Sequence, residues 1–232
     1  MTSNTGFKEP GKEHGEGDSM MKKEAKRALI VIDVQNEYFD GKLPIEFPPV
    51  NCSFANILRA MDAADAAGLP VIVVENILKE DYPVFARGSQ GAELNPAIAE
   101  RKRSHLVTKS FPSGFAGTGL KEWLKERGID TVAIVGYMTQ NCDLSAAVHA
   151  IHLGFAVEFL SDATGAISLA NRAGYASAED IHRVVCVVLQ SRFAAVMSTD
   201  EWVTLLEKGS EARRDTILGS LQKAREYGGT PR

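Results

Sequence analysis

The chain has 232 residues, of which 44% are hydrophobic and 24% are charged, and its formal net charge is −4. This composition is ordinary for a globular protein with a sizeable core, and the weak negative charge argues against a nucleic acid or an anionic membrane as partner. The apolar runs are far too short to span a bilayer. Three cysteines without paired spacing form no disulfide framework, so we expect a cytoplasmic protein.

The chain divides into three parts by composition. Residues 1–26 are polar and rich in Gly, Glu and Lys, without the apolar segment of a secretory signal, and we predict a disordered tail. Residues 27–207 carry alternating apolar and amphipathic runs and form the predicted domain. Residues 208–232 are predicted to be a C-terminal helical extension and tail.

Short, almost continuously apolar runs predict strands that are buried on both faces of a parallel sheet. These runs are 28–34, 70–75, 105–109, 131–136, 156–161 and 193–198. Helical patterns lie between most of them, over 51–68, 118–128, 140–154 and 177–191. The alternation predicts an α/β fold, a doubly wound three-layer sandwich around a mostly parallel six-stranded sheet. Segment 76–104 is long and loop-like, and is a candidate lid or pocket wall.

Reactive side chains of three kinds stand at the ends of predicted strands, where parallel sheets bind their ligands. They are Asp33, Lys109 and Cys142. Each alone has an ordinary explanation, as a turn residue, a solvated cation or a small core residue. Together they predict a thiol nucleophile, because a helix N-terminus and a nearby lysine lower a cysteine pKa from about 8.5. Asp33 can then take the thiol proton and return it to a leaving amine.

Three stretches that contain these residues resemble motifs of the isochorismatase-like cysteine hydrolases, which have a Rossmann-like fold. The stretches are "LIVIDVQNEYF", "LVTKSFPSGFAGTGL" and "VAIVGYMTQNCDLSAAVHAIHLGF", in the order of the family, and the resemblance runs from about Ala28 to Trp202. It implies that Asp33 is the general base, Lys109 the cation that stabilises the thiolate, and Cys142 the nucleophile.

The resemblance also implies a cis peptide bond between Tyr137 and Met138. Such a bond is expected to turn the Met138 N–H toward that of Cys142, and the two N–H groups would form an oxyanion hole. We expect Gly136 to permit a tight reversal of the backbone directly after the strand.

The departures from the family pattern narrow the expected reaction. Isochorismatases proper cleave a vinyl ether and lack the cysteine, so Cys142 favours hydrolysis of a C–N bond through a thioester acyl-enzyme. Ether or ester hydrolysis is the alternative, and a catalytically silent binding or scaffold subunit is a third. Nicotinamidases carry an Asp and His metal site after the second strand, whereas "VVENILKEDYPVF" has no histidine, so we expect neither a metal nor another cofactor.

The substrate is expected to be a small amide, carbamoyl or ureido compound. Candidate substrate-binding residues are Gln35, Phe39, Phe111, Phe115, Tyr137 and Gln140. Core packing is an equal explanation for the aromatic residues, and turn hydrogen bonds or orientation of Asp33 for Gln35. We expect Asp162 to support its loop rather than react.

Two further expectations concern the remaining cysteines and self-association. Cys52 and Cys186 are predicted to be inert, so that iodoacetamide would modify Cys142 first. The resemblance implies a homo-oligomer, a dimer or tetramer, with the helix predicted over 211–227 as a candidate interface element.

Overall fold

The computed structural model describes residues 25–228, so most of the predicted disordered tail lies outside the described residues. The strands are β1 Arg27–Ile32, β2 Val71–Asn76, β3 His105–Lys109, β4 Thr131–Tyr137, β5 Ala156–Gly165, β6 Leu169–Asn171, β7 Gly174–Ala176 and β8 Ala195–Met197. The α-helices are α1 Val50–Ala66, α2 Pro96–Ala99, α3 Leu120–Glu126, α4 Leu144–His152, α5 Ala178–Val188, α6 Thr199–Lys208 and α7 Ile217–Gly228. Short helical turns are η1 Asn36–Tyr38, η2 Gln90–Ala92, η3 Thr139–Asp143 and η4 Leu189–Phe193.

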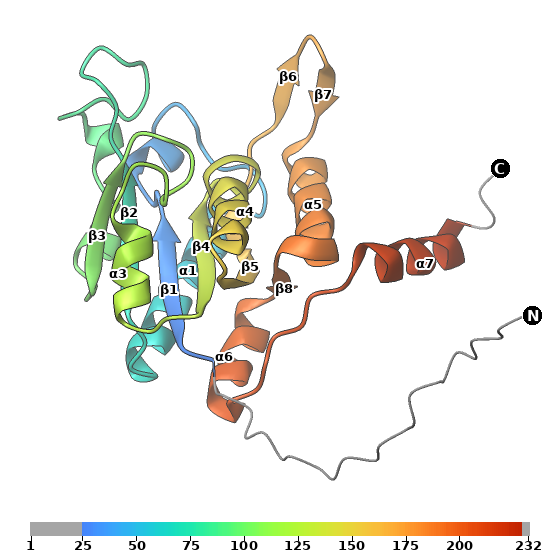
Figure 1. The fold of residues 1–232 in the computed structure, drawn as a ribbon. Helices are drawn as coiled ribbons and strands as arrows, with labels where there is room; N and C mark the ends of the chain where they lie inside the picture. The colour runs from blue at the N-terminus through green and yellow to red at the C-terminus, as the bar shows by residue number, and fades with distance from the viewer. Residues whose placement is uncertain (1–24, 229–232) are drawn as a thin grey trace, which may run out of the picture.

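Six strands form one sheet in the order β3-β2-β1-β4-β5-β8, and every neighbouring pair is parallel (Figure 1). The predicted six-stranded α/β sheet is therefore confirmed. After β1 the chain adds β2 and β3 on one side of the sheet, and it then adds β4, β5 and β8 on the other side. The direction in which strands are added therefore reverses between β1 and β4. A crevice at the carboxyl ends of these two strands is where sheets of this type bind ligands.

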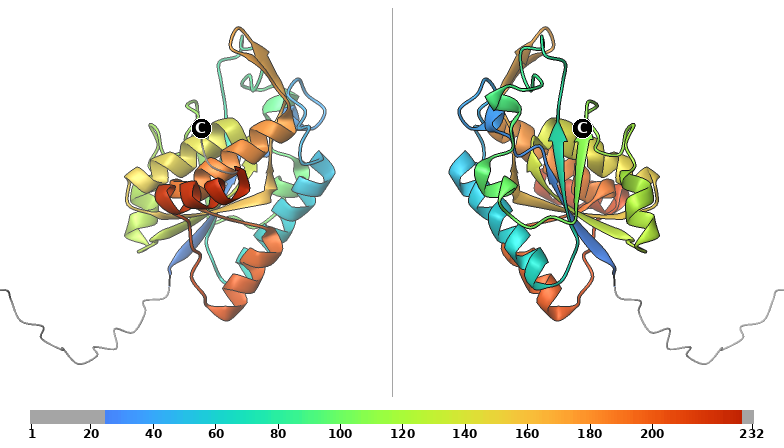
Figure 2. Two further views of the ribbon diagram at one scale, coloured as in Figure 1. Left: turned by 90° about the vertical axis from the view of Figure 1, so that its right-hand side faces the viewer. Right: turned by 90° about the vertical axis from the view of Figure 1, so that its left-hand side faces the viewer.

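Helices cover both faces of the sheet and bury two apolar clusters (Figure 2). Helices α3, α4 and α5 lie over one face, where Leu120, Leu124 and Ala147 are almost fully buried. Helices α1 and α6 lie over the other face, where Ile57 and Trp202 are fully buried. The small side chains of α4 allow its backbone to approach the sheet closely, which brings the start of this helix near the strand ends.

A two-stranded antiparallel hairpin of β6 and β7 projects from the body and was not predicted (Figure 1). Its turn is closed by Asn171, whose side-chain oxygen accepts the Ala173 N–H at 2.8 Å, and by Gly174 with φ 134°. The residues of β6 are exposed, so the hairpin has no buried face and no apolar alternation for a sequence pattern to detect.

The expected tight reversal at Gly136 is wrong, because β4 continues through this residue to Tyr137. Gly136 has φ 121° and pairs with Ile32 of β1. A Cβ atom at this position would overlap the backbone of Ile32. Glycine is therefore required because two strands approach closely here, and not because the chain turns.

The C-terminal part is two helices, as the sequence allowed. Helix α6 begins at a capping box of Ser198 and Glu201 and ends at Gly209, which has the left-handed φ of 60°. The chain segment after α6 is held by Arg27, whose guanidinium donates a hydrogen bond to the Ser210 carbonyl at 2.9 Å. The proposed domain boundary at residue 208 stays a prediction. Within residues 25–228 no helix is long and apolar enough to cross a membrane.

Candidate active site

The three predicted catalytic residues come from three elements that end at the same edge of the sheet. Asp33 follows β1, Lys109 is the last residue of β3, and Cys142 lies in the turn η3 after β4. Strand β2 separates β3 from β1, so the lysine must reach across its neighbour. Neighbouring strands are about 4.8 Å apart, and only a long side chain can bridge two such spacings.

The side chains of this triad meet in the interior. Lys109 Nζ lies 2.6 Å from Asp33 Oδ2 and 3.4 Å from Cys142 Sγ. Asp33 is 0% exposed, and Lys109 and Cys142 are each 3% exposed. The arrangement joins a carboxylate, a cation and a thiol away from bulk water, where their mutual interactions are strongest.

Asp33 adopts a backbone conformation that non-glycine residues rarely take. Its φ is 50°, its N–H donates to Val74 on the neighbouring strand, and its carbonyl accepts the Gln35 N–H at 2.8 Å. Aspartate tolerates this left-handed region better than most residues, and such outliers concentrate at functional sites. The turn points the carboxylate back over the strand end toward Lys109.

Burial dominates the ionisation of the site. It raises the pKa of the Asp33 carboxyl, although Lys109 opposes the change. It also raises the pKa of the Cys142 thiol, Asp33 adds to that increase, and Lys109 only partly offsets it. The expected lowering of the Cys142 pKa is therefore wrong, because burial and Asp33 outweigh the effect of Lys109. A thiol with a raised pKa requires a proton acceptor in order to react as a nucleophile.

The loop before the nucleophile has the expected peptide geometry. The bond between Tyr137 and Met138 is cis. The Met138 carbonyl then accepts the N–H groups of Asn141 and Asp143, at 2.9 and 3.3 Å, which closes the turn that carries Cys142. The oxyanion hole formed by the N–H groups of Met138 and Cys142 stays a prediction.

A second layer of side chains supports this turn. Thr139 and His182 are buried and share a hydrogen bond of 2.9 Å between Oγ1 and Nδ1. Asp162 Oδ1 accepts both the N–H and the hydroxyl of Thr199, at 2.8 and 2.7 Å, so it has the predicted supporting role. Cys186 is half-buried beside His182 Nε2 at 3.7 Å, and burial raises its pKa to about 12, as expected of an unreactive thiol.

The side chain of Gln35 fastens the loop after β2. Its amide nitrogen donates to the carbonyls of Asn76 and Ala92, at 3.0 and 2.6 Å, and its oxygen accepts the Asn76 N–H. Both of its N–H groups are thus occupied by backbone. The structure favours the supporting alternative for Gln35 over substrate contact.

The predicted aromatic residues divide between the core and the surface. Phe115 stacks on Phe155 in the core, and Tyr137 is fully buried with its hydroxyl 3.0 Å from Ser53 Oγ. Phe111 is 59% exposed. For these three the structure favours packing or exposure over a pocket wall. Half-buried Phe39 packs edge-on against Phe54, and its contact with substrate stays a prediction.

Two residues remain as candidates in the turn that carries the nucleophile. Gln140 is half-buried, with its amide nitrogen 3.3 Å from Met138 Sδ and its oxygen buried without a partner. Asp143 is fully buried, and neither of its carboxylate oxygens has a hydrogen-bond partner. Sequence reasoning missed Asp143, although a carboxylate directly after the cysteine and before an Ala-rich segment was a visible signal.

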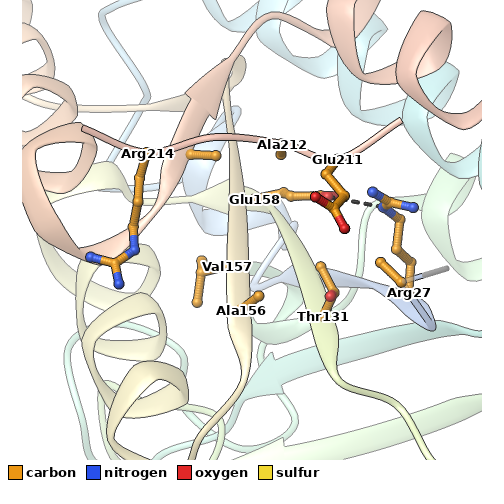
Figure 3. A pocket seen from close by; sticks show the side chains of 10 residues that line it. Arg27, Thr131, Ala156, Val157, Glu158, Glu211, Ala212 and Arg214 are labelled. Atoms are coloured by element: carbon orange, nitrogen blue, oxygen red, sulfur yellow. Dashed lines mark hydrogen bonds and ion pairs between the residues drawn. The ribbon is translucent and has the colours of Figure 1, made fainter. Parts of the chain in front are cut away.

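A pocket of about 220 Å³ is lined by residues that do not include the triad (Figure 3). It is lined by Arg27, Thr131 and Ala156, which are the first residues of β1, β4 and β5. It therefore opens at the amino-terminal edge of the sheet, opposite the triad. Arg27 and Glu158 form a buried ion pair of 2.9 Å beside it. Among residues 25–228 no group of three or more His, Cys, Asp or Glu could hold a metal ion.

Comparison with known proteins agrees with this fold. The model of the isochorismatase domain matches residues 27–201. The chain belongs to the isochorismatase family. A crystal structure of an isochorismatase-family protein from Burkholderia xenovorans is 59% identical, with a TM-score of 0.88, over 90% of this chain and 100% of that one. An isochorismatase family protein of Bacillus subtilis, YrdC, is 30% identical over 78% of this chain and 96% of its own length.

Some relatives have a stated reaction. Ureidoacrylate amidohydrolase RutB of Agrobacterium fabrum is 27% identical over 61% of this chain and 77% of its own length. Family membership makes this chain an isochorismatase-family hydrolase, and the bond that it cleaves has to be argued from the site.

Proposed function

We propose that this isochorismatase-family protein is a cysteine hydrolase that cleaves a C–N bond of a small amide, carbamoyl or ureido compound without a metal. The observation that supports the proposal is the buried contact of Lys109 with both Asp33 and Cys142. A carboxylate, a cation and a thiol at a strand edge are the groups needed to activate a nucleophile and to protonate a leaving amine.

The first half of the reaction follows from the resting thiol. Asp33 takes the Cys142 proton as the sulfur attacks the carbonyl carbon, and Lys109 stabilises the charge on sulfur. The N–H groups of Met138 and Cys142 stabilise the oxyanion. The C–N bond then breaks, the nitrogen receives the proton from Asp33, and the acyl group stays on sulfur as a thioester.

The second half restores the enzyme. Asp33, ionised again, takes a proton from water as the water oxygen attacks the thioester. The C–S bond breaks, a carboxylic or carbamic acid leaves, and the thiol regains a proton from Asp33. The raised pKa of the Asp33 carboxyl suits this double role, because a carboxylate with the ordinary pKa of about 3.9 is a weak base and accepts a proton from a thiol or a water molecule poorly.

The stated reactions of relatives support C–N hydrolysis. The names of two relatives, the ureidoacrylate amidohydrolase above and a nicotinamidase/pyrazinamidase of Mycobacterium tuberculosis with 29% identity, describe cleavage of an amide or ureide. Ether or ester hydrolysis is the alternative within the family. A catalytically silent subunit is disfavoured, because it has no physical need for a buried charged triad.

The test is release of ammonia from a panel of small primary amides and ureides, with matched methyl esters beside them. We expect hydrolysis of at least one amide or ureide, and a loss of about 10³-fold or more in Cys142→Ala. Cys52→Ser is the matched control, because Cys52 is exposed and belongs to no site described above. Equal rates for Cys142→Ala and the native enzyme would remove the mechanism, and cleavage of the esters alone would favour the alternative.

The three cysteines differ in solvent exposure, and this difference affects the design of a labelling experiment. Cys52 is exposed and Cys142 is buried, so access alone favours reaction at Cys52. Faster modification of Cys142 by iodoacetamide therefore stays a prediction. It has to be followed peptide by peptide in a Cys52→Ser background.

A further inference from the structure

Unpartnered buried oxygens gather at one place in the described part of the chain. Gln140 and Asp143 supply buried side-chain oxygens that have neither a hydrogen bond nor an ion pair within residues 25–228. Buried polar groups are normally paired, so this concentration needs an explanation. Both residues belong to the turn that carries Cys142.

Asp33 and Asp143 differ in what lies beside them. Asp33 has Lys109 as an ion-pair partner at 2.6 Å and faces the Cys142 thiol. Asp143 is equally buried but has neither a cation nor a donor in contact. The site thus holds two carboxyl groups and one lysine, and the lysine forms its ion pair with Asp33. Burial of a carboxyl group without a hydrogen-bond or ion-pair partner costs free energy. Asp143 therefore needs a hydrogen-bond donor, which the described residues do not supply.

Asp143 lies beside the reaction centre, because it directly follows Cys142 in η3. Its carboxyl is influenced by Asp33 and Lys109, and burial together with Asp33 raises its pKa. Asp143 in turn acts on the pKa of the Cys142 thiol and on that of the buried Tyr38 hydroxyl. Gln140 stands three residues before Asp143 in the same turn and adds one more unpaired acceptor.

We propose that Asp143 is a specificity-determining residue that binds an N–H donor of the substrate, a proposal that rests on the function proposed above. The enzyme then prefers compounds with an NH₂ group at the carbonyl and rejects those with a carboxylate there. Donors supplied by such a substrate satisfy Asp143 and Gln140, whereas an anion offers these oxygens no donor in a dry site.

The test uses two alkylating reagents that differ only at this position. Iodoacetamide carries an NH₂ group where iodoacetate carries a negative oxygen, and both are small. Their rates at Cys142 are measured by peptide mapping in a Cys52→Ser background and divided by their rates with glutathione. This ratio needs no knowledge of the natural substrate, and it cancels the intrinsic reactivity of each reagent.

We expect the normalised preference for iodoacetamide over iodoacetate to fall about tenfold in Asp143→Asn. Asp180→Asn is the matched control, because it removes the same formal charge from an exposed position and should leave the preference unchanged. Asp143→Ser serves as a second variant, and each variant must first show the cooperative thermal unfolding of the native protein.

The outcomes separate this inference from the proposed function. A preference that is unchanged in both folded Asp143 variants, with Cys142 still labelled, overturns the role of Asp143 and indicates that water satisfies it. Failure of both reagents to reach Cys142 in the native protein counts against the nucleophile itself, as does unchanged ammonia release by Cys142→Ala.

Discussion

At the scale of single residues, the ionisation of the site depends on a single contacting lysine and on burial. Lys109 is the cation in contact with Asp33 and Cys142, and burial raises the pKa values of Asp33, Cys142 and Asp143. The ionisation of the general base and of the thiol therefore depends on pH. This arrangement makes two measurable predictions.

The first prediction concerns the pH dependence of kcat/KM. Asp33 must be ionised to accept the thiol proton, and its pKa is raised, so activity should fall as pH drops through a value above the ordinary aspartate pKa of about 3.9. A pH profile of ammonia release measures this acid limb. Asp33→Asn should abolish activity rather than move the limb. An acid limb at the ordinary aspartate value would contradict the assignment.

The second prediction concerns stability. The raised pKa of Asp143 means that the folded state binds its proton more tightly than the unfolded state does. Stability from this group is fully present below the unfolded pKa and is lost as pH rises through the folded pKa. Asp143→Asn should therefore be more stable than the native protein by about 1–3 kcal/mol above that folded pKa. Thermal melts at low and high pH should show a gain that grows with pH, and a pH-independent difference would contradict it.

At the scale of elements, the end of β4 decides where the nucleophile stands. Gly136 brings β4 against β1, the cis peptide follows at Tyr137, and η3 presents Cys142 beside Asp33. Gly136 and Tyr137 both belong to β4, which lies between β1 and β5. A change in the strand contact should therefore affect both folding and the site.

Gly136→Ala tests the strand contact. The new Cβ would overlap the Ile32 backbone, and the φ of 121° is unfavourable for alanine. We expect a loss of about 3 kcal/mol or more in the free energy of unfolding, measured by urea denaturation. Gly154→Ala is a useful comparison, because φ is also positive there but no atom lies within 4 Å of the added Cβ. Equal losses at the two positions would show that strain alone is responsible.

At the scale of the whole molecule, α7 lies at the edge of the molecule beside α5 and η4 (Figure 1). Ile217, Leu218 and Leu221 on this helix are 56%, 64% and 47% exposed. Val187 on the neighbouring α5 is also 62% exposed. Exposed apolar side chains that gather on neighbouring helices are typical of interaction sites, and we propose that they pack against a second copy of the chain.

Light scattering after size exclusion tests this self-association. Leu218→Glu with Leu221→Glu should lower the molar mass, because buried charges in an apolar contact are costly and the exposed positions leave the fold unchanged. Gln222→Glu adds a charge at an exposed polar position of the same helix and should keep the native mass. A native protein that is already monomeric, or a double variant of unchanged mass, would contradict the proposal.

Sequence and tertiary structure determined different parts of this protein. Apolar runs and their spacing predicted the parallel six-stranded sheet, and strand ends predicted Asp33, Lys109 and Cys142, because periodicity and strand-end position are local properties. The hairpin of β6 and β7 was missed because it has no buried face. Burial of the triad, the raised pKa of Cys142 and the lack of a partner for Asp143 were decided only by the tertiary structure. These properties depend on which distant groups surround a side chain, and a linear pattern does not contain that information.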